Sequence, residues 1–308
     1  MKRLSLFALL MSAIMGGTAC AAEKFSTRTY PLSDFTNIHV SNVVKVIYTQ
    51  GNTYSVKLTG RTDWLGLMEV TSQGGTLKVY TNNGKKLNNT QKEDRPDGDH
   101  TFILELTAPC LNNINLNDAS SFEGKSLKSD RISLICNGAS TFKIDAIDCN
   151  TLNLNLNGAS RIKATDIACQ KIQANISGAN TTDIQHLKAK EVRFTTSGAS
   201  KIKLPDLSQG DTVIFNLHGA SKLTLSAEVK ELLQLRISGA SKSELTFKGG
   251  SLRTECKGGS KLKADVNCTS LNASCDGASR AVFKGTADKV EINQGGIANI
   301  DTSNLNQF

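Results

Sequence analysis

Gly138-Ala139-Ser140 opens a phrase that recurs down the second half of the chain, with single substitutions in some copies. The further copies are Gly158-Ala159-Ser160, Gly178-Ala179-Asn180, Gly198-Ala199-Ser200, Gly219-Ala220-Ser221, Gly239-Ala240-Ser241, Gly258-Gly259-Ser260 and Gly277-Ala278-Ser279. Subtracting successive glycine numbers gives 20, 20, 20, 21, 20, 19 and 19. Asp118-Ala119-Ser120 is an earlier copy without the glycine, and Gln294-Gly295-Gly296-Ile297 is a degenerate last one. A period this constant indicates a repeat protein in which each copy is one structural unit.

Apolar residues alternate with polar ones on both sides of each phrase, as at Ile132, Leu134 and Cys136 before the first copy and Phe142 and Ile144 after it. Period two is typical of a half-buried strand. A unit with two such strands and a shorter third piece cannot bury its own apolar face, but stacked units form a continuous core. A β-propeller needs about twice this period, and leucine-rich repeats would show Leu-x-x-Leu-x-Leu. We therefore predict an all-β fold, a right-handed parallel β-helix (solenoid) with Gly-Ala-Ser coils of about 20 residues.

The glycine and the serine of the phrase have structural roles in this prediction. A corner between two strands needs a backbone conformation that a Cβ atom resists, and glycine adopts it freely. Because neighbouring coils lie about 4.8 Å apart, the serines stack in a column where each hydroxyl can hydrogen-bond to the next coil. We interpret the phrase as a signature of the fold and not as a set of catalytic serines.

The first 22 residues have the pattern of a secretory signal peptide: Lys2-Arg3, an apolar run over 4–15, and small residues over 16–22. The apolar run is shorter than the ~20 residues of a membrane span. Cleavage after Ala21 or Ala22 fits the A-x-A rule. Alternatively, the residues ending at Cys20 resemble a bacterial lipobox, which would leave Cys20 lipidated as the only membrane anchor. We expect an exported protein of the periplasm, the outer-membrane surface or the extracellular space.

Residues 23–308 are expected to form a single β-helix domain, with 23–107 as the first coils and cap and 108–308 as the regular repeats. Segment 82–100 is polar and charged, so we expect a long, mobile, exposed loop, either a tolerated insertion or a contact site. The formal net charge of +8 falls when Lys2 and Arg3 leave with the signal. A basic exported chain favours anionic partners weakly, and nucleic acid is not expected among them.

Several further segments resemble a known family. They are Phe35-Thr36-Asn37-Ile38-His39-Val40-Ser41, Val46-Ile47-Tyr48-Thr49-Gln50-Gly51, Gly75-Thr76-Leu77-Lys78-Val79 and Leu104-Glu105-Leu106-Thr107-Ala108-Pro109. With the repeated phrase, their order is similar to the family described as "putative auto-transporter adhesin, head GIN domain" of Bacteroidetes-type bacteria. The resemblance runs from about Phe25 to about Ile300 and implies a β-helical fold and an envelope location. The chain departs from the motif at Asn42 and Asp118, where glycine is preferred, which leaves the geometry of these corners in question.

Cationic side chains recur three residues after the glycine of each phrase. In a β-helix they form one column, called the basic column below: Arg161, Lys201, Lys222, Lys242, Lys261 and Arg280, with Thr141 and Thr181 at the same position in two coils. Two residues further on, Lys143, Lys163, Lys203 and Lys263 project from the same face. Repulsion between exposed neighbours costs roughly a few tenths of a kcal/mol, so an ordinary solvated face is one interpretation. The functional one is a strip that binds acidic polysaccharide, lipopolysaccharide phosphates or other polyanions.

The cysteines also fall into columns. Cys256 and Cys275 precede their glycines by two residues, and Cys149 and Cys169 precede theirs by nine, so each pair is expected on adjacent coils. Neighbouring strands bring such residues within disulfide range, and export permits oxidation. Buried thiols acting as small hydrophobes are the slightly preferred alternative. It is supported by the odd number of cysteines that remains without Cys20, since Cys110, Cys136 and Cys268 have no evident partner.

Catalytic residues, metals and cofactors are not expected. Polysaccharide hydrolases on this fold need two carboxylates across a groove, and lyases need an acidic calcium site beside a basic residue. Here the acids are scattered, as at Asp183, which is expected to face Lys163 and Lys203. The four histidines share no register: His39, His100, His186 and His218. We predict a non-catalytic, adhesin-like binding or structural module of the cell envelope, with acidic polysaccharide, lipopolysaccharide or surface proteins as partners. A polysaccharide-degrading enzyme on the same scaffold is the alternative.

Overall fold

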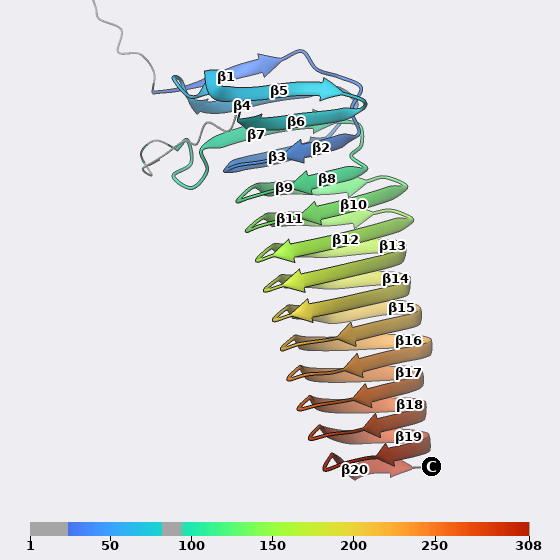
Figure 1. Ribbon diagram of the computed structural model, residues 1–308. Helices are drawn as coiled ribbons and strands as arrows, with labels where there is room; N and C mark the ends of the chain where they lie inside the picture. The colour runs from blue at the N-terminus through green and yellow to red at the C-terminus, as the bar shows by residue number, and fades with distance from the viewer. Residues whose placement is uncertain (1–23, 82–92, 94, 308) are drawn as a thin grey trace, which may run out of the picture.

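The computed structural model describes residues 24–81, 93 and 95–307, which form one 20-stranded sheet wound into a β-solenoid of about ten turns (Figure 1). Strands of successive coils pair in parallel, as Leu152 with Ile172 and Ile172 with Val192. The predicted solenoid with coils of about 20 residues is confirmed. The signal peptide, with Cys20, lies outside the described residues. Among the described residues, no helix has the length and apolarity needed to cross a bilayer.

The N-terminal end of the solenoid is built from both antiparallel and parallel strands. Its elements are β1 (Phe25–Tyr30), β2 (Asn37–Val40), β3 (Val44–Gln50), β4 (Ser55–Arg61), a 3-10 turn (Leu65–Leu67), β5 (Met68–Gln73), β6 (Thr76–Thr81) and β7 (Phe102–Ala108). Strands β1–β4, β4–β7 and β5–β6 pair antiparallel, whereas β7 pairs parallel to β3 and β6 parallel to β2. The chain therefore covers its first coil with a hairpin layer before the regular stacking begins.

Below this layer the coils follow one another down to the C-terminal end (Figure 1). The strands are β8 (Asn113–Leu116), β9 (Ser121–Lys128), β10 (Arg131–Cys136), β11 (Thr141–Asp148), β12 (Thr151–Gly158), β13 (Arg161–Gly178), β14 (Thr181–Gly198), β15 (Lys201–Leu217), β16 (Lys222–Ile237), β17 (Lys242–Cys256), β18 (Lys261–Cys275), β19 (Arg280–Gln294) and β20 (Asn299–Gln307). From β13 to β19 each strand runs through the turn opposite the Gly-Ala-Ser corner, so one strand supplies nearly a whole coil.

The core consists of apolar side chains that occupy equivalent positions in successive coils and point into the solenoid. Alternate residues point inward, so Phe142 pairs with Phe122 on the preceding coil and their rings stack with centroids 4.8 Å apart. Phe194 and Phe215 repeat this contact at 5.2 Å. All four rings are fully buried. The period-two pattern of the sequence thus becomes columns of like side chains, and each column gains its burial from the coils above and below it.

The Gly-Ala-Ser corner is held by hydrogen bonds between coils. The carbonyl oxygen of each corner glycine accepts an N–H of the next coil, in most coils that of the alanine, as from Ala179 to Gly158 at 2.7 Å. The glycines have positive φ, 101° at Gly178, a region that disfavours side chains. The serines are buried, and the Ser200 hydroxyl donates to the Gly178 carbonyl at 3.0 Å. The expected structural roles of glycine and serine therefore hold in this structure.

The two corners without glycine keep the same backbone conformation. Asn42 has φ 73° and Asp118 has φ 61°. Asparagine and aspartate tolerate this region better than other residues with side chains. The Asp118 carboxylate also accepts the N–H of Asn42 at 2.9 Å, which ties the two corners together. The geometry that the sequence left in question is thus preserved.

Candidate anion-binding column

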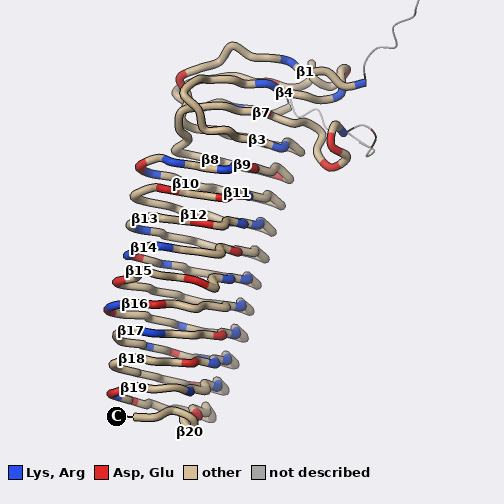
Figure 2. Tube along the Cα trace, turned by 180° about the vertical axis from the view of Figure 1, so that it is seen from behind, with Lys and Arg blue, Asp and Glu red and all other residues tan. Residues whose placement is uncertain are grey.

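The basic column forms as expected from its spacing. Ladder pairing runs Lys201–Lys222–Lys242–Lys261–Arg280, one cation on each of five consecutive coils, and all five residues are exposed. Arg161 belongs to the same column but is separated from Lys201 by Thr181. Figure 2 shows basic residues following one another along this edge of the solenoid. At a rise of about 4.8 Å per coil, the five cations span about 19 Å along the axis.

Most cations of the basic column lack a carboxylate partner. Some lysines elsewhere pair with carboxylates on neighbouring coils, as Lys171 does with Glu191 at 2.9 Å and Lys284 with Asp265 at 2.9 Å. Other described lysines, such as Lys188 and Lys190, form no ion pair. In the part of the chain that the structure describes, Lys201, Lys242 and Lys261 form no ion pair, and Lys222 reaches Glu244 at 3.6 Å. The column is therefore a regular row of cations, one per coil, of which most are uncompensated.

The second set of lysines does not make a continuous strip. Asp183 lies between Lys163 and Lys203 in the ladder, as expected from the sequence. Glu244 lies between Thr224 and Lys263. Carboxylates thus interrupt this second row, and the positive potential of the face comes mainly from the basic column.

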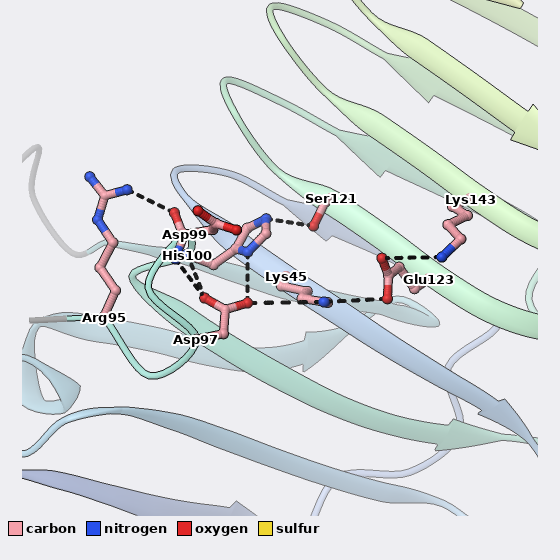
Figure 3. Close-up of polar contacts among 8 residues, drawn as sticks. All are labelled: Lys45, Arg95, Asp97, Asp99, His100, Ser121, Glu123 and Lys143. Atoms are coloured by element: carbon pink, nitrogen blue, oxygen red, sulfur yellow. Dashed lines mark hydrogen bonds and ion pairs between the residues drawn. The ribbon is translucent and has the colours of Figure 1, made fainter. Parts of the chain in front are cut away.

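A separate polar cluster joins segment 95–100 to the first coils (Figure 3). The His100 ring accepts or donates a hydrogen bond at each nitrogen, Nδ1 to Asp97 at 2.9 Å and Nε2 to Ser121 at 2.9 Å. The Lys45 ammonium lies 4.0 Å from Asp97 and 3.3 Å from Glu123, which also reaches Lys143 at 3.9 Å. We call Asp97, His100 and Ser121 the clasp, because they hold this segment against β9.

Hydrogen bonds also set the protonation of the clasp carboxylate. Burial by itself would raise the pKa of Asp97. The N–H groups of Asp99 and His100 and the imidazole all bond to the carboxylate, and together they lower its pKa below the ordinary value. Asp97 is therefore ionised over the neutral range and fixes the orientation of the His100 ring.

Residues 34–209 and 209–307 match the model of the family described as "Putative auto-transporter adhesin, head GIN domain". The chain belongs to this family. Membership supports an adhesin-like, exported or cell-surface module. No curated protein matches the chain.

Two solved structures share the fold of this GIN-domain chain. A "putative lipid binding protein" from Parabacteroides distasonis is 16% identical, with 89% of this chain and 97% of that chain covered and a TM-score of 0.61. A "putative adhesin" from Parabacteroides merdae is 14% identical, with 91% and 97% covered and a TM-score of 0.51. At these identities the likeness concerns the fold alone.

The clasp of the GIN-domain chain has the hydrogen-bond order of a Ser-His-Asp triad but not its surroundings. A triad needs a reachable hydroxyl and free N–H groups that form an oxyanion hole. Ser121 is only 8% exposed and lies in register between Lys45 and Thr141 in a continuous ladder. The neighbouring Ser120 N–H is bonded to the Asn117 carbonyl at 3.2 Å. This geometry suits a structural contact that docks the segment.

The clasp was not predicted from the sequence. Segment 82–100 was expected to be an exposed loop, and most of it, 82–92 and 94, lies outside the described residues. Its described end, 95–100, contacts β9 through His100 and Ser121 and approaches β3 through Asp97 and Lys45. The available signal was Ser121, which occupies the column position that holds a cation in most later coils. A small hydroxyl there leaves space for a covering segment.

The remaining histidines stay apart, as expected from their lack of a shared register. His186 contacts Asp206 at 2.8 Å and His218 contacts Ser238 at 2.7 Å, each one coil away and exposed. His39 lies between the Asn115 and Asn117 amides at 3.2 Å from each. Among the described residues, no group of three His, Cys, Asp or Glu side chains could hold a metal ion.

Proposed function

We propose that this protein is a non-catalytic, adhesin-like module of the cell surface whose basic column binds linear anionic polysaccharide. The observation that carries the proposal is the run of cations from Lys201 to Arg280, one per coil and largely without carboxylate partners. Family membership supports the adhesin-like class. The polysaccharide ligand and its binding along this edge go beyond what family membership supports.

The shape of the column favours a polymer over a small anion. A single carboxylate or phosphate can neutralise one or two cations, whereas the charges continue along the solenoid axis for about 19 Å. A chain with one carboxylate per sugar, laid parallel to the axis, would meet a new cation at nearly every sugar. Many weak contacts on one polymer then add up to useful affinity. Such binding is screened by salt, because the charges are exposed.

Binding to a polyuronate at low and high ionic strength tests this proposal. The variant changes Lys201, Lys222, Lys242 and Lys261 to Gln. A matched control changes Lys188, Lys190, Lys230 and Lys289 to Gln, four exposed lysines near the turn opposite the Gly-Ala-Ser corner. Both variants lose four positive charges, so net charge alone would weaken them equally.

We expect the control to bind like the unchanged protein and the column variant to lose binding by at least tenfold at low salt. The unchanged protein should also lose affinity steeply between about 50 and 200 mM salt. Equal binding by the two variants would remove the column from the proposal. Binding that is insensitive to salt would argue against an electrostatic site altogether.

A polysaccharide-degrading enzyme is the alternative function, and one surface hollow is the candidate site for its catalysis. This hollow has a volume of about 420 Å³ and is lined by two carboxylates on adjacent coils, Glu123 and Asp145. Glu123 is bracketed by Lys45 and Lys143, which suits an ion-paired carboxylate better than the proton donor that glycoside hydrolysis requires. New reducing ends or unsaturated sugars that disappear in Glu123→Gln or Asp145→Asn would overturn the non-catalytic assignment.

A further inference from the structure

Four of the cysteines form two pairs on adjacent coils. Cys256 on β17 lies opposite Cys275 on β18 in the ladder. Cys149 and Cys169 directly follow Asp148 and Ala168, which pair with each other. In both pairs the two thiols lie close enough for each to influence the pKa of the other. All four are free thiols in this structure.

The spacing of the coils suits a covalent link between the members of each pair. In-register residues on neighbouring strands have Cα atoms about 4.8 Å apart, and disulfides join Cα atoms about 4.4–6.8 Å apart. Both members of each pair are buried at equivalent inward positions of adjacent coils, so their side chains leave the backbone on the same side. Little backbone movement is therefore needed to close either bond.

The pairs differ in how well a reagent can reach them. Cys149 and Cys169 lie near the surface, with 8% and 9% exposed, whereas Cys256 and Cys275 are 0% and 1% exposed. The neighbouring thiol and burial raise the pKa of Cys169 and of Cys256 above the ordinary thiol value. Attack needs a thiolate that can contact the oxidant, so the interior pair is protected once the coils have stacked.

We propose that Cys149–Cys169 and Cys256–Cys275 are oxidisable cross-links between adjacent coils, the first closing in the folded protein and the second only while the chain folds. The oxidant is a disulfide compound. One thiolate attacks a sulfur of that disulfide, forms a mixed disulfide and releases one thiol. The neighbouring cysteine loses its proton, attacks the mixed disulfide and releases the second thiol. Two electrons and two protons pass to the oxidant, and one sulfur–sulfur bond forms in the protein.

Two of the three other described cysteines supply internal controls. Cys136 is as buried as the interior pair but lies between Leu116 and Leu156 in the ladder. Cys268 lies between Gly249 and Ala287. Neither has a cysteine on an adjacent coil in register, so neither can form such a link. In an oxidising compartment the two bonds would fasten neighbouring coils; this inference does not depend on polysaccharide binding.

The test is oxidation of the reduced, folded protein without its signal peptide by oxidised glutathione at pH 8, followed by tryptic mapping without reduction. Tandem mass spectrometry of the linked peptides assigns each bond, because Cys268 and Cys275 share the tryptic peptide 264–280. We expect the peptides with Cys149 and Cys169 to become linked within the first hour, and those with Cys256 and Cys275 to stay reduced. Refolding from denaturant in the same oxidant should close both bonds. Both links together should raise the Tm by roughly 10 °C or more.

Three variants distinguish the effect of disulfide formation from the effect of removing a buried thiol. Cys149→Ala should abolish only the first link, and Cys256→Ala only the second. Cys136→Ala removes a similar buried thiol and should leave both links intact. Stable glutathione adducts without closure, equal oxidation rates for the two pairs in the folded protein, or links that involve Cys136 or Cys268 would each overturn the proposal.

Discussion

Replacing Gly178 by alanine should destabilise the solenoid far more than an ordinary glycine-to-alanine change. An added Cβ would lie 2.3 Å from the Gly158 carbonyl oxygen of the preceding coil, and Gly178 has φ 101°. That oxygen cannot move away, because it accepts the N–H of Ala179 at 2.7 Å. Left-handed backbone costs a residue with a side chain roughly 1–2 kcal/mol, and overpacking adds about 1–3 kcal/mol. We expect a loss of about 2–5 kcal/mol in the free energy of unfolding.

Two other glycines calibrate this prediction. At Gly258 the φ is also positive, 70°, but the nearest atom is 3.2 Å away, so alanine there should cost mainly the backbone part, about 1–2 kcal/mol. At Gly66 nothing lies within 4 Å and φ is not positive, so alanine should change stability by less than about 1 kcal/mol. The expected order of destabilisation is Gly178, then Gly258, then Gly66.

Urea unfolding followed by far-UV circular dichroism measures this order. Because a long repeat array can unfold in parts, amide hydrogen exchange should accompany it. Exchange should accelerate first at the coils on either side of Gly178, where the corner hydrogen bonds would be stretched. Equal midpoints for Gly178→Ala and Gly258→Ala would refute the close-approach argument, even if both variants were destabilised.

Three further changes test other parts of the structure. Burial and the nearby Lys78 charge lower the pKa of His39 in the folded protein. The unfolded chain therefore binds a proton at this ring more readily, and the free energy of unfolding should fall as pH drops below about 6.5. His39→Gln should reduce this pH dependence of the urea midpoint between pH 7.5 and 5.5. Phe194→Ala removes a fully buried, stacked ring and should cost about 3–5 kcal/mol in urea unfolding, more than Phe194→Leu. His100→Ala should open the clasp and raise endoproteinase Asp-N cleavage of the Gly98–Asp99 bond several-fold, as should Ser121→Ala. Unchanged cleavage would mean that the clasp does not hold the segment.

Much of this protein is determined by periodicity that is readable without coordinates. The constant interval between Gly-Ala-Ser phrases sets the coil, and alternation at residues such as Leu152 and Leu154 sets which side chains face inward. Stacking then follows, because one unit cannot bury its own apolar face. For the same reason the basic column could be assigned residue by residue: a residue at a fixed place in the repeat must lie beside its counterpart on the next coil.

Only the tertiary structure decided contacts that do not repeat. The clasp joins His100 to Ser121 across a segment outside the repeat, so no periodic argument could place it. The antiparallel pairing of β4 with β7 depends on long-range closure rather than on local pattern. The distribution of ion pairs also came from the fold, since whether a lysine is compensated depends on rotamers and on carboxylates from other coils. Sequence periodicity fixes register along the axis, whereas partners across irregular segments depend on how the whole chain packs.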